Sequence, residues 1–447
     1  MTGTLSREVI STRQQKMATL ARIEPKLVLT TLAHHIDATW LREAYRRTRK
    51  DGAAGVDGVT AAQYETDLEG NLERLLERFK TGRYRAPAVR RVYIPKDGAG
   101  KQVRPIGIPT LEDKILQRAV TMVLEPVYEE DFLDCSYGFR PGRSAHQALE
   151  ALWREVMNIG GGWIIDLDIQ SFFDSVDWGH LRSFLDQRVR DGVIRRAVGK
   201  WLNAGVMEAG AVWHPDRGTP QGGVVSPLLS NVYLHEVLDL WFEREVRPRL
   251  RGRAFMVRYA DDAVLGFECE GDARRVLAVM AKRFAKYALT LHPHKTRLLD
   301  FRRPSGQHRA PSPGEGSFDM LGFTHFWARS RKGRWVVKRK TAKGRFGRGL
   351  KRIGRWCRWN RHQPVAAQHA ALNRKLKGHY DYYGITGNAR ALSRFRREAE
   401  RTWRSWLSRR SRQRADMTWE KFQRLLQRYP LAPPRVVHSV YGHAANP

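Results

Sequence analysis

The feature that most constrains this chain is a pair of adjacent aspartates set between two apolar runs. The motif Tyr259-Ala260-Asp261-Asp262 lies between apolar stretches at 254–257 and 263–267. This pattern predicts two strands joined by a tight β-hairpin that carries the aspartates at its tip. An isolated Asp-Asp pair is most often a solvated turn. Between two apolar strands, however, the two carboxylates repel each other unless a cation lies beside them, so we expect a divalent metal ion here.

A second source of carboxylates lies upstream, in residues 163–169. Period-two alternation places Ile165, Leu167 and Ile169 on one face of a predicted strand and Asp166 and Asp168 on the other. If this strand and the hairpin share a sheet, Asp168 and Asp261 converge on two Mg²⁺ ions roughly 4 Å apart. That arrangement activates a 3′-hydroxyl and stabilises a pyrophosphate leaving group.

The remaining acids near this site have lesser expected roles. Residues 261 and 262 point to opposite sides if both are extended, so we expect Asp261 to bind metal directly and Asp262 to contribute to one ion. Asp166 lies one pleat deeper than Asp168, and we predict a structural role for it.

The charge of the chain points to a polyanionic partner. Its 447 residues include 80 Lys and Arg against 46 Asp and Glu, which gives a net charge of +34 and a pI near 10.7. Residues 331–447 alone hold 31 Lys and Arg and five Asp and Glu. Nucleic acid is therefore the expected partner, bound mainly by the C-terminal part of the chain.

The number of cysteines and the hydropathy of the chain indicate the cellular compartment of the protein. Cys135, Cys269 and Cys357 are scattered and odd in number, so they predict free thiols and neither a disulfide framework nor a zinc module. No apolar run approaches the length of a membrane span, and the N-terminus lacks a signal-peptide core. We expect a cytoplasmic protein that does not engage a membrane. A mitochondrial presequence stays open as the minor alternative, because residues 1–23 carry Ser, Thr and Arg and a single acid.

Patterning divides the chain into three predicted regions. Residues 1–90 form a helical N-terminal extension and the start of the next region. Residues 91–328 form a mixed α+β domain, and residues 329–447 form a basic helical region. The second region opens with a basic hairpin formed by runs at 92–95 and 103–108. A helix is then expected from Leu111 to Leu124, where Pro126 ends it.

Seven blocks of this sequence, in order, resemble a known family, the group II intron-type reverse transcriptases or maturases. The blocks are Ile94-Pro95-Lys96, residues 104–109 (RPIGIP), residues 137–144 (YGFRPGRS), residues 168–174 (DIQSFFD), residues 218–223 (GTPQGG), residues 259–262 (YADD) and Leu321-Gly322-Phe323. The resemblance covers residues 51–442. It implies an α+β right-hand polymerase with fingers, a palm built on an antiparallel sheet, and an α-helical thumb.

The resemblance also implies residues that bind the incoming nucleotide. Lys96 and Arg104 match positions that hold its triphosphate, although two solvated hairpin cations would show the same pattern. Phe173 matches an aromatic residue that excludes a ribose 2′-hydroxyl, with simple core filling as the alternative. Gln221 matches a loop beneath the nascent base pair, and an ordinary glycine-rich turn is its alternative.

Template and RNA contacts are implied at five further positions. Arg140 and Arg143 lie on a loop suited to template phosphates, or on a merely basic turn. Lys295 matches a lysine near the active site that supplies electrostatic support. Arg355 and Arg358 lie in predicted helices where arginine alternates with tryptophan, a pattern suited to RNA, although at least half of those tryptophans are expected to be core.

Together these implications predict an RNA-directed DNA polymerase with two Mg²⁺ ions. Its expected partners are an intron RNA template, a DNA primer, deoxynucleotides and target DNA, with a second role in splicing of the intron of a mobile element. Two alternatives stay open: an RNA-binding splicing factor without polymerase activity, and a reverse transcriptase linked to host defence or a CRISPR system. The sequence leaves the oligomeric state undetermined.

Overall fold

The computed structural model describes residues 2–95, 103–219, 222–304, 316–410 and 417–439. Two compact units divide the chain: unit 1 comprises residues 1–148 and 164–298, and unit 2 comprises residues 149–163 and 299–447. The described elements confirm a mixed α and β class.

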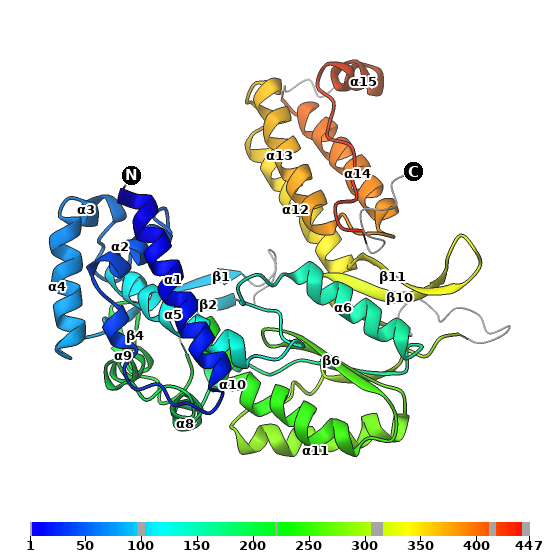
Figure 1. Ribbon diagram of the computed structural model, residues 1–447. Coiled ribbons are helices and arrows are strands. Elements are labelled where there is room, and N and C mark those ends of the chain that lie inside the picture. The colour runs from blue at the N-terminus through cyan, green and yellow to red at the C-terminus, as the bar shows by residue number, and fades with distance from the viewer. Residues whose placement is uncertain (1, 96–102, 220–221, 305–315, 411–416, 440–447) are drawn as a thin grey trace. The chain divides into compact units, whose positions relative to one another are not determined.

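Unit 1 begins with helices, as the sequence predicts. In α2, Asp37 caps the first turn by accepting a hydrogen bond from Trp40 N at 2.8 Å. The buried Trp40 indole donates to Ala119 O at 3.0 Å and so ties α2 to α5. In Figure 1, α1 runs alongside α5. The elements of this part are α1 (Thr2–Ile23), η1 (Ala33–His35), α2 (Ala38–Arg47), α3 (Ala61–Glu65), α4 (Leu68–Lys80) and α5 (Leu111–Asp131).

The predicted end of α5 at Pro126 is wrong, because the helix continues to Asp131. A proline inside a helix removes one backbone donor and opposes the helix locally. Here Val123 and Leu124 before it and Val127 and Tyr128 after it are all buried. Packing of the helix on both sides of the proline outweighs the local cost.

The basic hairpin predicted at 92–95 and 103–108 is confirmed as two antiparallel strands of a four-stranded sheet. Arg91 pairs with Gly107 and Ile94 pairs with Arg104, so Arg91 and Arg104 lie on opposite faces of this hairpin. The strand order is β2-β1-β4-β5. The strands are β1 (Val89–Pro95), β2 (Val103–Ile108), β4 (Val206–Glu208) and β5 (Ala211–Trp213).

A second four-stranded sheet, with the order β6-β7-β3-β8, carries the acidic motifs. The predicted hairpin is confirmed: β6 (Ala254–Tyr259) and β7 (Asp262–Phe267) pair antiparallel. The strand β3 (Trp163–Leu167) lies next to β7, and β8 (Arg297–Asp300) lies beyond it. The condition set by the sequence, that the Asp168 strand and the hairpin share one sheet, is met.

The other helices of this part of the chain lie before and after these strands in sequence; most of α6 belongs to unit 2 and the rest belong to unit 1. After the short helix α7, a new helix begins at Trp178, because Asp177 caps its first turn by accepting a hydrogen bond from His180 N at 2.8 Å. After α10 the helix widens into two π-helical turns, η2 and η3. The elements are α6 (Ala145–Asn158), α7 (Phe172–Ser175), α8 (Trp178–Asp186), α9 (Gly192–Leu202), α10 (Ser226–Leu234), η2 (His235–Asp239), η3 (Trp241–Val246), η4 (Arg247–Arg249) and α11 (Glu270–Lys286).

Unit 2 combines a three-stranded antiparallel sheet with a helical bundle. The strand order is β11-β10-β9, formed by β9 (Ser317–Met320), β10 (Phe323–Arg329) and β11 (Trp335–Thr341). The boundary expected near 328 falls inside this sheet, and the compact units divide at 298/299 instead. Apart from the two predicted hairpins, the sequence does not show which strands pair with each other.

The bundle has its own hydrophobic core. The helices α12, α13 and α14 lie side by side in Figure 1, and the aromatic residues Tyr380, Phe395 and Trp403 are buried between them. The helices are α12 (Lys343–Trp359), α13 (Val365–Tyr383), α14 (Ala389–Leu407) and α15 (Trp419–Arg428). In the parts of the chain that the structure describes, no helix is both long and apolar enough to cross a membrane.

Candidate active site

The β6–β7 hairpin has a two-residue turn formed by Ala260 and Asp261. Tyr259 pairs with Asp262 across the hairpin and closes this turn. Ala260 adopts a φ of 58°, a left-handed conformation that a residue with a Cβ rarely takes. Asp261 therefore lies at the tip, half-buried, and Asp262 begins β7 with an exposed side chain.

Asp168 lies just beyond the end of β3, where residues 292–296 fix its backbone. Its carbonyl oxygen accepts hydrogen bonds from His292 N at 2.9 Å and from the Thr296 hydroxyl at 3.0 Å. Its carboxylate receives Lys295, whose Nζ lies 3.3 Å from both oxygens. The acid is thus held at the strand end by groups that leave its carboxylate half-exposed.

In the structure, Asp168 lies close enough to Asp261 for its charge to affect the pKa of the Asp261 carboxyl group. Burial raises the pKa of the Asp261 carboxyl, and repulsion by the Asp168 carboxylate raises it further. Arg104 and Arg258 oppose this shift by attraction. Two mutually repelling carboxylates at one sheet edge favour a cation between them.

Asp166, for which the sequence predicts a structural role, forms an ion pair. Its Oδ2 accepts from Arg297 Nη2 at 2.8 Å, an ion pair within unit 1. The carboxylate of Asp166 is thus paired with a protein cation inside unit 1.

The acidic site suits Mg²⁺ in its donor chemistry. Mg²⁺ prefers oxygen ligands and is bound by one or two protein carboxylates together with water and substrate phosphates. Asp168 and Asp261 supply two such carboxylates at one strand edge. Among the described residues no set of three or more His, Cys, Asp or Glu forms a complete metal cage. Substrate phosphates would therefore have to complete the coordination.

The nucleotide-binding candidates are only partly covered by the structure. Lys96 and Gln221 lie outside the described residues. Arg104 is exposed on β2, close enough to Asp261 to stabilise its charge. Phe173 is half-buried on α7, with its ring against Phe172 at a centroid distance of 5.4 Å, and its carbonyl oxygen accepts from Thr219 N at 2.7 Å.

The expected template contact by Arg140 is contradicted by its placement. The Arg140 side chain is 3% exposed, and it pairs with Glu129 at 3.0 Å. Its other donors bond the carbonyl oxygens of Leu133 at 2.7 Å and Ser136 at 2.9 Å. The Arg140 guanidinium therefore stabilises the loop that carries it. The sequence alone does not show that an acid and backbone carbonyl oxygens surround this side chain.

The other RNA candidates are accessible. Arg143 is 29% exposed at its side chain and pairs with Asp134 at 2.6 Å. Arg355 and Arg358 are exposed on α12, and Trp359 next to them is 75% exposed. By contrast Trp403 is fully buried, and Trp356 and Trp406 pack against the same core. The expectation that at least half of these tryptophans are core is confirmed.

Sequence reasoning missed the residues behind the hairpin tip. Arg258 on β6 is fully buried and forms a bidentate ion pair with Asp239 on η2, with distances of 2.8 and 2.5 Å. Burial would lower the pKa of Arg258, but Asp239 outweighs this effect and holds the pKa raised. A charged residue between the apolar run 254–257 and the motif at 259–262 was the available signal.

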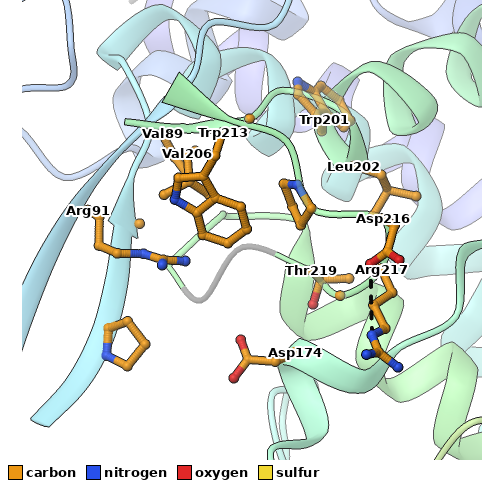
Figure 2. A pocket seen from close by; sticks show the side chains of 15 residues that line it. Val89, Arg91, Asp174, Trp201, Leu202, Val206, Trp213, Asp216, Arg217 and Thr219 are labelled. Atoms are coloured by element: carbon orange, nitrogen blue, oxygen red, sulfur yellow. Dashed lines mark ion pairs between the residues drawn. The ribbon is translucent and has the colours of Figure 1, made fainter. Parts of the chain in front are cut away.

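A cavity of about 410 Å³ lies elsewhere in unit 1. Figure 2 shows Arg91, Trp213 and Thr219 around it, and the Arg91 guanidinium lies 4.6 Å from the centre of the Trp213 ring. None of the three candidate metal ligands lines this cavity. It lies on the Arg91 face of the β1–β2 hairpin, whereas Arg104 lies on the other face, and its lining includes Asp174, Gly218 and Thr219 of the 168–174 and 218–223 blocks.

Comparison with known proteins identifies the family of the chain. Residues 94–325 match the family model for reverse transcriptase (RNA-dependent DNA polymerase). Over 250 residues, or 54% of this chain, the chain is 38% identical to Protein YkfC of Escherichia coli (strain K12) and 34% identical to Group II intron-encoded protein LtrA of Lactococcus lactis subsp. cremoris. The matches cover 65% and 41% of those two relatives.

A plant relative is more distant. Nuclear intron maturase 2, mitochondrial, of Arabidopsis thaliana is 27% identical over 235 residues, which cover 44% of this chain and 30% of the relative. In each of these three comparisons the match spans less than two thirds of the relative's length. The chain belongs to the reverse transcriptase (RNA-dependent DNA polymerase) family and, within it, to the group II intron type.

Proposed function

We propose that the protein is an active RNA-directed DNA polymerase that adds deoxynucleotides to the 3′ end of a DNA primer on an RNA template. The observation that carries this proposal is the placement of Asp168 and Asp261 at neighbouring strand ends of one sheet, where each carboxylate repels the other. A member of the family that had lost polymerisation would have no need to keep this unfavourable pair.

The proposed mechanism assigns the acids to metal binding. Asp168 and Asp261 would hold two Mg²⁺ ions, and Asp262 would contribute to one of them. When bound, the ions would lower the pKa of the primer 3′-hydroxyl and neutralise the pyrophosphate that leaves. Because Asp261 is half-buried at a fixed turn, its carboxylate is oriented before the substrate arrives.

The proposed nucleotide contacts come from β2 and α7. Arg104 is exposed, and its positive charge attracts the Asp261 carboxylate. This position suits contact with a triphosphate bound at the same metal site. Lys96 and Gln221 stay in the proposal on the resemblance alone. Phe173 is half-buried within the 168–174 block and would exclude a 2′-hydroxyl by volume.

The proposed nucleic-acid surface lies mainly in unit 2. Arg355, Arg358 and Trp359 form one exposed stretch of α12, and such a mixture of cations and an aromatic ring suits an RNA backbone and an unstacked base. We propose an intron RNA as the bound RNA, with assistance to its splicing as a second role, because the similar proteins are named for group II introns and intron maturation. In the right-hand description of a polymerase, unit 1 contains the proposed fingers and palm. The α12–α14 bundle is the proposed thumb.

Primer extension on poly(rA) with an oligo(dT) primer tests the proposal. We expect Mg²⁺-dependent incorporation of dTTP by the full chain. RNA binding without any incorporation would contradict the polymerase and favour the splicing factor. Splicing of the flanking intron RNA, with and without the protein, tests the second role separately, and an absent intron would favour a defence-linked enzyme.

A further inference from the structure

A buried network lies directly behind the hairpin tip that carries Asp261. Its centre is Arg258, which is fully buried two residues before the turn. Burying a charge costs several kcal/mol unless the charge is paired and its hydrogen-bonding groups are satisfied. Asp239, also fully buried, meets this need with Oδ1 2.8 Å from Nε and Oδ2 2.5 Å from Nη2.

The remaining donors of Arg258 reach the turn itself. Nη1 donates to Ala260 O at 3.0 Å and to Asn231 Oδ1 at 3.0 Å. The carbonyl of Ala260 and the amide nitrogen of Asp261 belong to one planar peptide unit. The guanidinium therefore fixes the orientation of the peptide from which the Asp261 side chain projects.

A second chain segment is tied into the same network. Asn231 Nδ2 donates to Gly138 O at 2.8 Å. The backbone of Arg258 bonds to the same segment. Its amide donates to Cys135 O at 2.7 Å, and its carbonyl oxygen accepts from Tyr137 N at 2.9 Å. Gly138 lies so close to the turn that a Cβ added to it would be 2.3 Å from Ala260 N. The turn is thus enclosed by backbone on one side and by the guanidinium on the other.

The turn needs such support because two effects oppose its geometry. Ala260 has a φ of 58°, a conformation that costs on the order of 1 kcal/mol for a residue with a Cβ. Asp261 is also repelled by Asp168. Relaxation of the turn would relieve both effects and would move Asp261 away from the shared metal site.

We propose that Arg258, held by Asp239, is a positioning residue that keeps the Asp261 carboxylate in place to bind metal together with Asp168. This inference rests on the proposed function, since it concerns the same metal site. Arg258 contacts the turn backbone and not the substrate, so its loss should weaken metal binding before it weakens binding of RNA.

The chain offers a matched control in Arg188. This residue is 5% exposed, pairs with Asp131 at 2.9 Å and donates to the carbonyl oxygens of Glu24 and Leu27. It is therefore a second buried, ion-paired arginine of unit 1 that bonds backbone carbonyls, and its hydrogen bonds reach none of the acidic-site residues. Arg188→Lys should destabilise the fold as Arg258→Lys does without affecting the metal site.

The test compares the full-length wild type, Arg258→Lys and Arg188→Lys. Three quantities are measured: thermal unfolding, the Mg²⁺ concentration for half-maximal primer extension, and Mn²⁺ binding by electron paramagnetic resonance without nucleotide. We expect Arg258→Lys to raise both the half-maximal Mg²⁺ concentration and the Mn²⁺ dissociation constant about ten-fold. Arg188→Lys should leave both within two-fold at a comparable loss of thermal stability.

A milder variant covers the case in which Arg258→Lys does not fold. Asn231→Ala removes one acceptor of Nη1 and the link to Gly138 but keeps the Arg258–Asp239 pair, and we expect about a three-fold weakening of Mn²⁺ binding. Unchanged metal binding in a folded Arg258 or Asn231 variant, or an equal change in Arg188→Lys, would overturn the inference. A wild type that binds Mn²⁺ but makes no DNA would overturn the proposed function alone.

Discussion

Lys295 Nζ lies 3.3 Å from each carboxylate oxygen of Asp168. The lysine is 60% exposed at its side chain, so the pair is a loose ion pair and not a buried bridge. Its ammonium lies against the carboxylate that is proposed to bind metal. The same lysine can therefore compete with a metal ion for Asp168 and can neutralise phosphate once the metal is bound.

Removal of this competing cation should tighten metal binding slightly. For Lys295→Met we expect a two- to five-fold lower Mn²⁺ dissociation constant without nucleotide, because an exposed ion pair contributes up to about 1 kcal/mol. Mn²⁺ titration by electron paramagnetic resonance measures this, and Lys282→Met on α11 is the control. Weaker Mn²⁺ binding in Lys295→Met would show instead that the lysine supports the metal site.

Phe173 should decide between deoxynucleotides and ribonucleotides. Phe173→Ala removes the ring that is proposed to meet the 2′ position, so we expect the preference for dTTP over UTP to fall about ten-fold or more. Single-nucleotide primer extension with each substrate measures the ratio. Phe172→Leu, a change at the buried neighbour, controls for loosening of α7. An unchanged ratio in Phe173→Ala would leave core filling as the role of the ring.

The exposed arginines of α12 should contribute to RNA affinity through phosphate charge. For Arg355→Ala combined with Arg358→Ala, we expect weaker RNA binding at low salt and a smaller salt dependence, by about two counterions in the log–log slope. Filter binding at several salt concentrations measures both. Arg401→Ala is the control, since Arg401 pairs with Glu398 at 2.9 Å on α14. Equal slopes in the double variant and the wild type would exclude these arginines from the interface.

The buried His325 of unit 2 should make the fold sensitive to acid. Burial lowers the pKa of His325 to about 3, and repulsion by Arg339 contributes. Neither ring nitrogen has a hydrogen-bond partner, and the ring stacks on Phe318 at 4.9 Å. The unfolded chain takes up a proton below pH 6.5 and the folded chain does not, so this residue's contribution to stability is lost as pH falls from about 6.5.

Replacement of this histidine should remove part of that sensitivity. Between pH 7.5 and pH 4.5 we expect His325→Leu to lose less unfolding free energy than the wild type, by on the order of 2 kcal/mol. Urea unfolding at both pH values measures the difference, and the exposed His362→Leu is the control. Parallel losses in His325→Leu and the wild type would show that His325 is protonated in the folded state.

Local patterns in the sequence predicted the parts of the site that depend on neighbouring residues. The alternation around Asp168 and the apolar runs around Asp261 were sufficient to predict the strand and the hairpin, because strand periodicity is a local property. Pro126 shows the limit of such reasoning, since tertiary packing carried α5 past a residue that locally ends helices.

Long-range pairing was not predictable from a single sequence. Arg140 reads as a template contact until Glu129 and two carbonyl oxygens are found around it. Arg258 and Asp239 are separated by other elements along the chain, and only the fold shows that they are joined beneath the turn. The division of the compact units at 298/299 is likewise seen only in the fold.

The most direct test of the central claim is primer extension by Asp168→Asn and Asp261→Asn, each assayed beside the wild type for DNA synthesis and for RNA binding. Each change keeps the side-chain shape and removes one of the two charges that are proposed to hold metal. We expect each to lower synthesis at least about a thousand-fold, as loss of a metal-binding charge should, with RNA affinity within two-fold of the wild type. Synthesis within ten-fold of the wild type by a folded Asp168→Asn or Asp261→Asn variant would contradict the shared metal site.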